Sequence, residues 1–437
     1  MIFLILALVV LLIIIGLPVY LSFAAGSFLY MMLSGTSMGS VLSTAFYALD
    51  SYSLLALPLF MIAGSLMEVS GIAEKLVNLA DAILKKVKGG LAATIPLASM
   101  FFGAISGSGT ATVAAMSTIL TDRLVDAGWD RRYIAALLAV SGPLGYMIPP
   151  NINAILYALV SNTSVTDLFM ASLLPGIVWG LLFILINRIV YKNWYHPDKA
   201  VVKSEADIKI QEKMSYFGNV WNATRSALPA LVMPIVILGG IYGGVFNATE
   251  AGAIACLYAV IVGFFIYKRV TKKDMTRVFV SQGNALGTLL IILPFANVFT
   301  RLLVTNRVPE MVADTMMSIS SSPIVQIFLM VVIFIIAGFF FDPGVLTFVL
   351  TPLFIPTANM IGMDLIQLGV ILFAAIAIGN VTPPMAFYLF IACKASKVTV
   401  PEIIRPLAIF SVFGSLPVML LISYWPSFSL WLPRLLR

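Results

Sequence analysis

The chain has 437 residues, of which 61% are hydrophobic and only 10% are charged, and its mean hydropathy is +1.04. These values exclude a soluble globular protein, because a buried core alone does not need so many long apolar segments. The formal net charge is +7, but lysines and arginines gather in a few loops, which indicates membrane topology rather than a nucleic-acid partner. The composition therefore predicts an all-α polytopic protein embedded in membrane lipid.

Metal and disulfide chemistry has little support in the sequence. Cys256 and Cys393 lie in apolar segments without a pairing pattern, and His196 lies in a polar loop. We therefore expect no metal-ligand cluster and no cofactor other than coupling ions.

The first apolar stretch, residues 1–33, is interrupted by Gly-Leu-Pro at residues 16–18. We expect two short helices joined by a turn, and one long kinked helix is the alternative. A membrane span ending near Glu68 follows. Residues 71–88 have apolar side chains at helical spacing on one face and are predicted to lie along the membrane interface.

Residues 91–105 are apolar, but as a helix they would extend only ~22 Å at ~1.5 Å per residue, less than the ~30 Å hydrocarbon thickness. Basic residues such as Lys88 precede this segment, and others such as Arg123 follow the next apolar piece. Both ends are therefore expected on the cytoplasmic side. A re-entrant hairpin with the tract SGSGT, residues 106–110, at its tip is consistent with both observations.

The next apolar segment, residues 134–159, is long enough to cross but is broken at residues 142–151 by glycine and a proline pair. Residues 168–186 return to the largest polar loop, which is rich in lysine and is therefore predicted to be cytoplasmic. We assign residues 1–190 to a first half, residues 191–225 to a solvated cytoplasmic linker, and residues 226–437 to a second half.

The break in the first half has a counterpart in the second. The sequence LGYMIPPNIN at residues 144–153 aligns, at an offset of 234 residues, with IGNVTPPMAF at residues 378–387. The same offset places SGSGT on FFDPG, residues 340–344. A few identities would be weak evidence alone, but their shared order favours an internal repeat. We therefore predict a second hairpin tip at residues 340–344 and a second helix break at residues 379–385.

The second half is predicted to have the opposite orientation. Two spans separated by residues 247–250 return to a basic cluster at residues 268–273, and one further span, residues 278–304, then reaches the outside. The second hairpin, residues 325–360, would therefore enter from the periplasmic side. This arrangement is an inverted-topology repeat in which each half has a re-entrant helical hairpin and a broken helix. Residues 403–424 form the last predicted span.

Each hairpin tip is expected to meet the broken helix of its own half. Unwound backbone inside a membrane must be satisfied by protein, water or an ion, and its carbonyl oxygens are hard donors that suit sodium rather than zinc. Small residues alone are explained by close helix packing, but their repetition beside a proline break favours a site. The predicted first sodium site contains Ala104, Ser106, Gly145, Ile148 and Asn151, and the second contains Gly338, Asp342, Gly379, Thr382 and Met385. The predicted substrate-binding residues are Ser106, Ser108, Thr110, Asn153, Asp342 and Asn380.

Asp342 is the carboxylate most clearly placed at membrane depth. An ionisable group there is functional by default. Three roles stay open for it: sodium ligation, substrate contact, and a structural cap for the following turn.

The tip GAISGSGTAT at residues 103–112 and the breaks PLGYMIPPN and GNVTPPM are the most specific parts of a family resemblance. Nearly the whole chain resembles the large membrane subunit of a tripartite ATP-independent periplasmic (TRAP) transporter. The resemblance implies sodium-driven uptake of organic acids across a bacterial inner membrane, with sialic acid favoured and C4-dicarboxylates next. It also implies a small four-helix membrane subunit, a periplasmic substrate-binding protein and an elevator mechanism. Because this chain begins at its own Met1, we expect the small subunit to be a separate polypeptide.

Two alternative functions are compatible with parts of the pattern. A stand-alone sodium/carboxylate symporter would have the same inverted hairpins, and co-purification of a small helical partner would distinguish it. An intramembrane hydrolase needs an activated nucleophile or a metal, and the sequence offers a motif for neither. A passive channel is disfavoured because discontinuous helices suit occlusion rather than a continuous pore.

Overall fold

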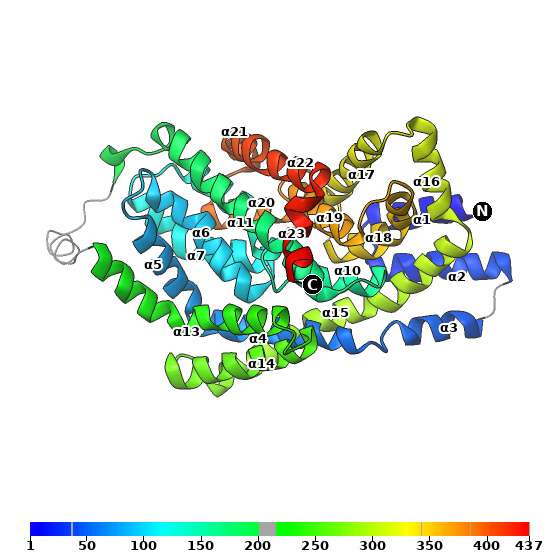
Figure 1. Ribbon diagram of the computed structural model, residues 1–437, viewed down its shortest axis with the longest axis horizontal. Helices are drawn as coiled ribbons and strands as arrows, with labels where there is room; N and C mark the ends of the chain where they lie inside the picture. The colour runs from blue at the N-terminus through cyan, green and yellow to red at the C-terminus, as the bar shows by residue number, and fades with distance from the viewer. Residues whose placement is uncertain (36–37, 201–215, 342, 385, 437) are drawn as a thin grey trace.

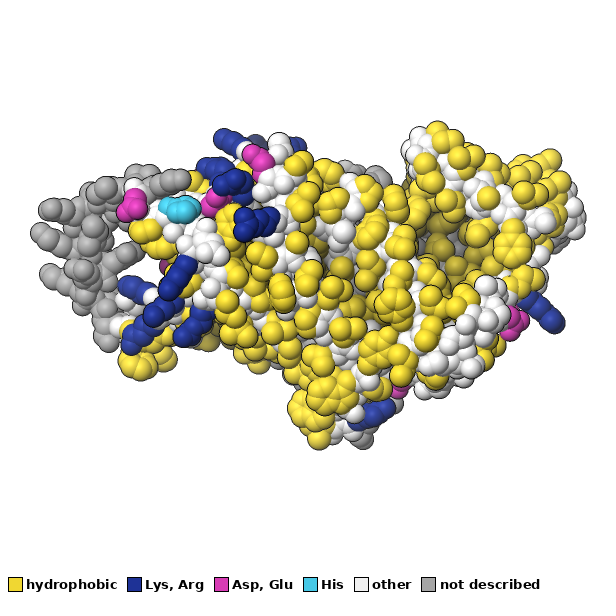
Figure 2. All heavy atoms as spheres, turned by 90° about the horizontal axis from the view of Figure 1, so that it is seen from above, with side chains coloured by type: hydrophobic (Ala, Val, Ile, Leu, Met, Phe, Trp, Pro, Cys, Tyr) yellow, Lys and Arg dark blue, Asp and Glu magenta, His cyan; other side chains and the backbone are white. Residues whose placement is uncertain are grey.

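The structure is a computed structural model that describes residues 1–35, 38–200, 216–341, 343–384 and 386–436. Within these residues the chain is almost entirely helical, and one isolated bridge joins Trp129 and Tyr195. Seven of the described helices are long and apolar enough to cross a membrane, or eight if one bent pair counts as a single span. Figure 2 shows a mostly hydrophobic surface on which lysine and arginine side chains gather mainly at one end. The all-α polytopic class is confirmed.

The N-terminal apolar stretch forms two short helices, α1 (Ile2–Ile14) and α2 (Val19–Ser34). They pack side by side, because a Cβ atom added at Gly26 would lie only 2.3 Å from Cγ2 of Val9. Pro18 is the N-cap residue of α2, a position where its missing N–H costs no helical hydrogen bond. The two helices joined by a turn are therefore confirmed, and the single kinked helix is wrong.

The other helices of the first half are α3 (Met38–Tyr47), η1 (Tyr52–Leu55), α4 (Ala56–Val69), α5 (Ile72–Leu84), α6 (Gly90–Ser106), α7 (Gly109–Asp126), α8 (Arg131–Ser141), α9 (Leu144–Met147), α10 (Ile152–Ser161) and α11 (Val165–Val190). The short turns η2 (Tyr191–Asn193) and η3 (Pro197–Lys199) follow. The second half contains α13 (Tyr216–Tyr242), α14 (Ala248–Ile261), η4 (Val262–Ile266), α15 (Lys272–Thr305), α16 (Val308–Ile319), α17 (Pro323–Gly338), α18 (Pro343–Met360), α19 (Leu365–Gly379), α20 (Phe387–Ser396), α21 (Val400–Phe410), η5 (Ser411–Ser415), α22 (Leu416–Tyr424) and α23 (Pro426–Leu436). No pattern described above predicts α3 or α23.

The linker between the halves begins and ends with ordered structure that composition did not predict. Residues 216–225 belong to α13, and the Tyr216 hydroxyl donates a hydrogen bond to the backbone oxygen of Ile83 at 2.9 Å. At the other end, Trp194 stacks on Tyr133 with ring centroids 5.5 Å apart. Polar composition suggested a solvated loop for these residues, whereas aromatic packing holds them against the helices. The predicted boundaries at 191 and 225 are therefore corrected.

Helix α15 begins at Lys272, ahead of the predicted span 278–304, and has 34 residues. Its start is a capping box, in which the Asp274 N–H donates to the Thr271 hydroxyl at 3.2 Å and the Thr271 N–H donates to the Asp274 carboxylate at 3.1 Å. At ~1.5 Å per residue the helix is ~51 Å long, well beyond the ~30 Å of a hydrocarbon core. Figure 1 shows α15 running lengthwise through the molecule, where it packs on α2 and α4.

Both halves contain a helical hairpin followed by a broken helix, at the predicted residues. In the first half α6 and α7 form the hairpin, and the helices on either side of the break are bent by 49°. In the second half α17 and α18 form the hairpin, and α19 and α20 flank the break. Helix α6 has 17 residues and α17 has 16, fewer than the ~20 that a span needs. Helix α18 is long enough to cross but contains Pro352 and Pro356.

The two halves interlock at their breaks. Helix α20 packs on α7 and α8 of the first half, while α10 packs on α18 of the second half. The Tyr157 hydroxyl on α10 donates to the backbone oxygen of Leu365 at 2.6 Å, and Tyr146 donates likewise to Phe373. Figure 1 shows these segments meeting near the centre of the molecule. This packing brings both tips and both breaks to one place.

Candidate functional site

Glycine lets each hairpin touch the break of its own half. A Cβ atom added at Gly103 would lie 2.6 Å from Cα of Gly145, and one added at Gly379 would lie 2.6 Å from Cα of Gly338. Carbon atoms pack at ~3.5–4.0 Å, so no side chain fits at either contact. Each half therefore contains a glycine junction; the offset of 234 that aligns Gly145 with Gly379 places Gly103 on Ala337, one residue before Gly338. In the first junction the close contact involves Gly103, the residue before Ala104, whose role as a sodium ligand stays a prediction.

The first tip is stabilised by serine and threonine hydroxyl groups. Ser108 is the N-cap of α7, and its hydroxyl oxygen accepts from a backbone N–H of the first turn at 3.3 Å. The Thr112 hydroxyl donates to the carbonyl oxygen of Ser108 at 2.7 Å and lies 3.4 Å from the Ser106 hydroxyl. Gly107 has a φ of +59°, and a Cβ atom there would lie 2.5 Å from the oxygen of Pro150. The tip is therefore pressed against the unwound backbone of the break.

Asn151 is the N-cap of α10, and its side chain is engaged in that role. Its Oδ1 accepts from the N–H of Asn153 at 2.8 Å and from that of Ala154 at 3.1 Å. Only the oxygen can accept these bonds, so Nδ2 faces the other way, where it is buried without a partner among the described residues. An amide N–H cannot ligate a cation. A sodium ion at this junction would therefore depend on oxygens other than that of the Asn151 side chain, and Ala104, Ser106, Gly145 and Ile148 stay its predicted ligands.

The second junction has a different polar lining. The Thr382 hydroxyl donates to the backbone oxygen of Ile378 at 2.8 Å, which leaves its own oxygen able to accept. Asp342 and Met385, both predicted for the second sodium site, lie outside the described residues. The ligand sets of both sodium sites stay predictions.

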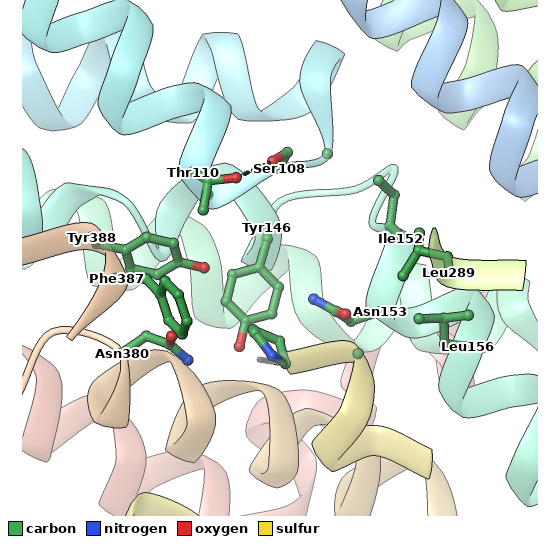
Figure 3. Close-up of a pocket in the computed structure, with 14 residues that line it drawn as sticks. Ser108, Thr110, Tyr146, Ile152, Asn153, Leu156, Leu289, Asn380, Phe387 and Tyr388 are labelled. Carbon is green, nitrogen blue, oxygen red and sulfur yellow. Dashed lines mark hydrogen bonds between the residues drawn. The ribbon is translucent and has the colours of Figure 1, made fainter. Parts of the chain in front are cut away.

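A cavity of about 200 Å³ lies where the tips and breaks of the two halves meet (Figure 3). The first residues of four helices line it: Gly109 of α7, Ile152 of α10, Pro343 of α18 and Phe387 of α20. Each half thus contributes one hairpin and one broken helix to a common wall. The other lining residues are Gly107, Ser108, Thr110, Tyr146, Asn153, Leu156, Leu289, Gly344, Asn380 and Tyr388.

The electrostatics of the cavity favour an anion without the help of a cationic side chain. Among the described residues that line it, none is lysine, arginine, aspartate or glutamate. A helix start carries roughly half a positive elementary charge on its unpaired N–H groups, and such ends bind carboxylate and phosphate groups. Four helices start at this cavity, of which two already have a side-chain cap, Ser108 for α7 and Asn151 for α10, and Asp342, the residue before Pro343, lies outside the described residues.

Four of the six predicted substrate-binding residues, Ser108, Thr110, Asn153 and Asn380, line this cavity. Ser106 is not part of the lining, because it lies behind the tip with its hydroxyl near Thr112. The geometry brings the four residues together, and their role in binding stays a prediction.

Tyr146, Tyr388 and Leu289 are among the lining residues that had no predicted role. Tyr146 and Tyr388 stand close to the two proline pairs in the sequence, so proximity to a break is a signal that could have identified them. Tyr388 packs closely on the first hairpin, since a Cβ atom added at Gly109 would lie 2.5 Å from its hydroxyl oxygen. Leu289 belongs to α15 and has no such signal, because only the packing of α15 brings it to the cavity.

Comparison with known proteins identifies relatives along nearly the whole chain. The model of the DctM component of the tripartite ATP-independent periplasmic transporters matches residues 6–428. The C4-dicarboxylate TRAP transporter large permease protein DctM of Pseudomonas aeruginosa is 33% identical over 94% of this chain and 93% of its own length. The ectoine TRAP transporter large permease protein TeaC of Halomonas elongata is 31% identical over 96% of each chain. The sialic acid TRAP transporter permease protein SiaT of Haemophilus influenzae is 28% identical over 97% of this chain and 66% of its own length.

A solved structure shares the fold. The YdaH transporter of Alcanivorax borkumensis matches with a TM-score of 0.62 at 13% identity, over 89% of this chain and 88% of that one. The family match extends over both hairpins, both breaks and the cavity between them. The chain is therefore a multi-pass membrane protein that belongs to the DctM family of TRAP transporter components.

Proposed function

We propose that this chain is the permease that moves an organic anion into a bacterial cell across the inner membrane, driven by a sodium gradient. The observation that carries the proposal is the convergence of four helix starts on one cavity whose described lining residues carry no charge. That arrangement stabilises a carboxylate inside the membrane and releases it more readily than a buried lysine or arginine would. Because the relatives are transporter permeases, the chain is not an enzyme, and the hydrolase alternative is wrong.

The partners follow from the family. A TRAP large permease works with a small membrane subunit and a periplasmic binding protein. The isethionate TRAP transporter permease protein DctMQ of Oleidesulfovibrio alaskensis is longer than this chain, which covers 64% of it. We propose that a separate four-helix subunit and a periplasmic substrate-binding protein act with this chain.

Sodium coupling and an elevator motion are part of the proposal. Beside the two glycine junctions the chain is not helical at residues 148–151 and 380–384, and carbonyl oxygens freed in this way need a partner inside a membrane. Figure 1 shows α4, α13, α14 and α15 as a layer along one side of the hairpins and breaks. This layering supports a motion in which the hairpins, breaks and cavity move together against that layer.

The size of the cavity supports a small acid. Its volume of about 200 Å³ is below the ~300–1,000 Å³ of pockets that hold drug-sized ligands. The large permeases named for C4-dicarboxylates are among the relatives, and so is one named for sialic acid. We propose a C4-type carboxylate first, with sialic acid as the second candidate.

The test is uptake into proteoliposomes that contain the large and small subunits, with the periplasmic binding protein added outside. Radiolabelled succinate, malate and N-acetylneuraminate are compared with and without an inward sodium gradient. We expect accumulation of at least one acid only when the gradient and both partners are present. Robust uptake by the large subunit alone would favour the stand-alone symporter, and accumulation without any sodium gradient would refute the proposed coupling.

A further inference from the structure

Helices α13 and α14 place two cations next to each other on the outer layer of the molecule. The helices pack on each other (Figure 1), and the Tyr267 hydroxyl donates a hydrogen bond to the backbone oxygen of Ser226 at 2.9 Å. Arg225 is the chain neighbour of Ser226, and Lys268 is the chain neighbour of Tyr267. The two cations therefore lie at the same level of the helix pair, at its predicted cytoplasmic end.

Both cations are exposed, and neither forms an ion pair among the residues that the structure describes. The next residue along the chain, Arg269, differs in this respect, because its guanidinium lies 3.0 Å from the carboxylate of Glu74. The positive-inside rule accounts for basic residues in cytoplasmic loops, but Arg225 lies within helix α13. Two neighbouring positive charges are thus left to an anion from outside the described chain.

Lys268 stands at a backbone position where glycine is ordinarily found. It lies just after the π-helical turn η4, and its φ is +52°. A residue with a Cβ atom is disfavoured in this left-handed conformation, so helices usually end there with glycine. A lysine at the C-terminal end of a helix also interacts well with the helix dipole, but that effect does not explain Arg225. A shared anion explains both.

Exposed apolar side chains border the two cations. Trp221 precedes Arg225 by four residues, so both lie on one face of α13, and Phe265 precedes Lys268 by three residues. Trp221 is 70% exposed and Phe265 is 71% exposed. Tryptophan is typical of the level of the lipid headgroups. Leu228, further along the same face of α13, is also exposed, so the surface combines a charged part with a part that suits acyl chains.

We propose that Arg225 and Lys268 bind the phosphate headgroup of an anionic phospholipid such as phosphatidylglycerol, whose acyl chains lie along the exposed apolar side chains of α13 and α14. Basic residues clustered at a membrane surface attract anionic lipids, and the arginine fork forms paired hydrogen bonds with phosphate oxygens. A zwitterionic lipid has no net charge to offer this pair. The site does not involve the transported acid, so it stands independently of the proposed function.

Arg225→Gln combined with Lys268→Gln is the test. The purified full-length protein in detergent is titrated with phosphatidylglycerol or with phosphatidylcholine, and native mass spectrometry measures the bound lipid. The wild type should bind phosphatidylglycerol about thirtyfold more tightly than phosphatidylcholine, which corresponds to ~2 kcal/mol for two basic residues. The double variant should lose this preference and keep the wild-type affinity for phosphatidylcholine. It should fold, because both side chains are exposed.

Arg188→Gln combined with Lys192→Gln is the matched control. Arg188 lies in the last turn of α11 and Lys192 in the following turn η2, and both are exposed, so this variant removes the same two kinds of charge. It should keep the preference for phosphatidylglycerol. An equal loss in the control would show a response to net charge and would overturn the site, as would equal binding of the two lipids by the wild type. Complete displacement of phosphatidylglycerol by millimolar inorganic phosphate would make a soluble anion the occupant and would overturn the lipid assignment.

Discussion

Gly379→Ala is the sharpest test of the junction geometry. The added methyl carbon would lie 2.6 Å from Cα and 2.7 Å from the carbonyl carbon of Gly338, and 2.7 Å from the oxygen of Ile335. Carbon atoms pack at ~3.5–4.0 Å, so α17 would have to move by roughly 1 Å. All three contacts are backbone atoms that cannot rotate away. The cost therefore lies near the upper end of the ~1–3 kcal/mol range for overpacking.

A small gain offsets part of this cost. Gly379 is the last residue of α19, and alanine is favoured over glycine in a helix by roughly 0.5–1 kcal/mol. We expect a net loss of about 2 kcal/mol and a fall in sodium-driven uptake of at least about tenfold, the change that ~1.4 kcal/mol produces. The measurements are thermal unfolding of the purified protein in detergent, followed by tryptophan fluorescence, and gradient-driven uptake.

Gly287→Ala on α15 is the matched control. A Cβ atom there meets nothing within 4 Å, so the variant should unfold at the temperature of the wild type or slightly above it and should transport normally. Wild-type stability and uptake in Gly379→Ala would refute the assignment of this contact as a junction that only glycine can form.

Three further outcomes are expected. Single cysteines at Lys88 and Ser322 should react with impermeant thiol reagents from opposite sides of the membrane, and labelling from one side only would contradict the inverted repeat. Asp130 is the N-cap of α8, so Asp130→Ala should lower the free energy of unfolding by about 1 kcal/mol. Burial raises the pKa of its carboxyl group, but hydrogen bonds from Arg132 outweigh this and lower the pKa overall. A lowered pKa stabilises the fold above the ordinary value of about 3.9, so the difference between the variant and the wild type should shrink as the pH falls below it, and a difference that is constant with pH in denaturation curves would count against this. Finally, omission of either the small subunit or the binding protein from the proteoliposomes should reduce uptake to background, and unchanged uptake would argue for a stand-alone symporter.

Much of the architecture could be predicted from the sequence because it depends on local chemistry. A proline pair next to glycine interrupts a helix wherever it stands, because proline lacks the N–H and glycine tolerates unusual backbone angles. The interruption between α8 and α10, the end of α19 at Gly379 and the turn between α6 and α7 therefore lie in the predicted segments. The length of α6, 17 residues, is too short for a helix that crosses the membrane. Ser108, Thr110, Asn153 and Asn380 were identified as neighbours because they belong to these locally encoded features.

Tertiary packing decided what local chemistry leaves open. The close contact between Gly103 and Gly145 could not be predicted, because the rotation of one helix against another depends on every contact along both. Leu289 lies in the predicted span 278–304, but only the packing of α15 brings it to the cavity. Two of the four helix starts come from the first half and two from the second, and only the interlocking of the two halves brings them to one cavity.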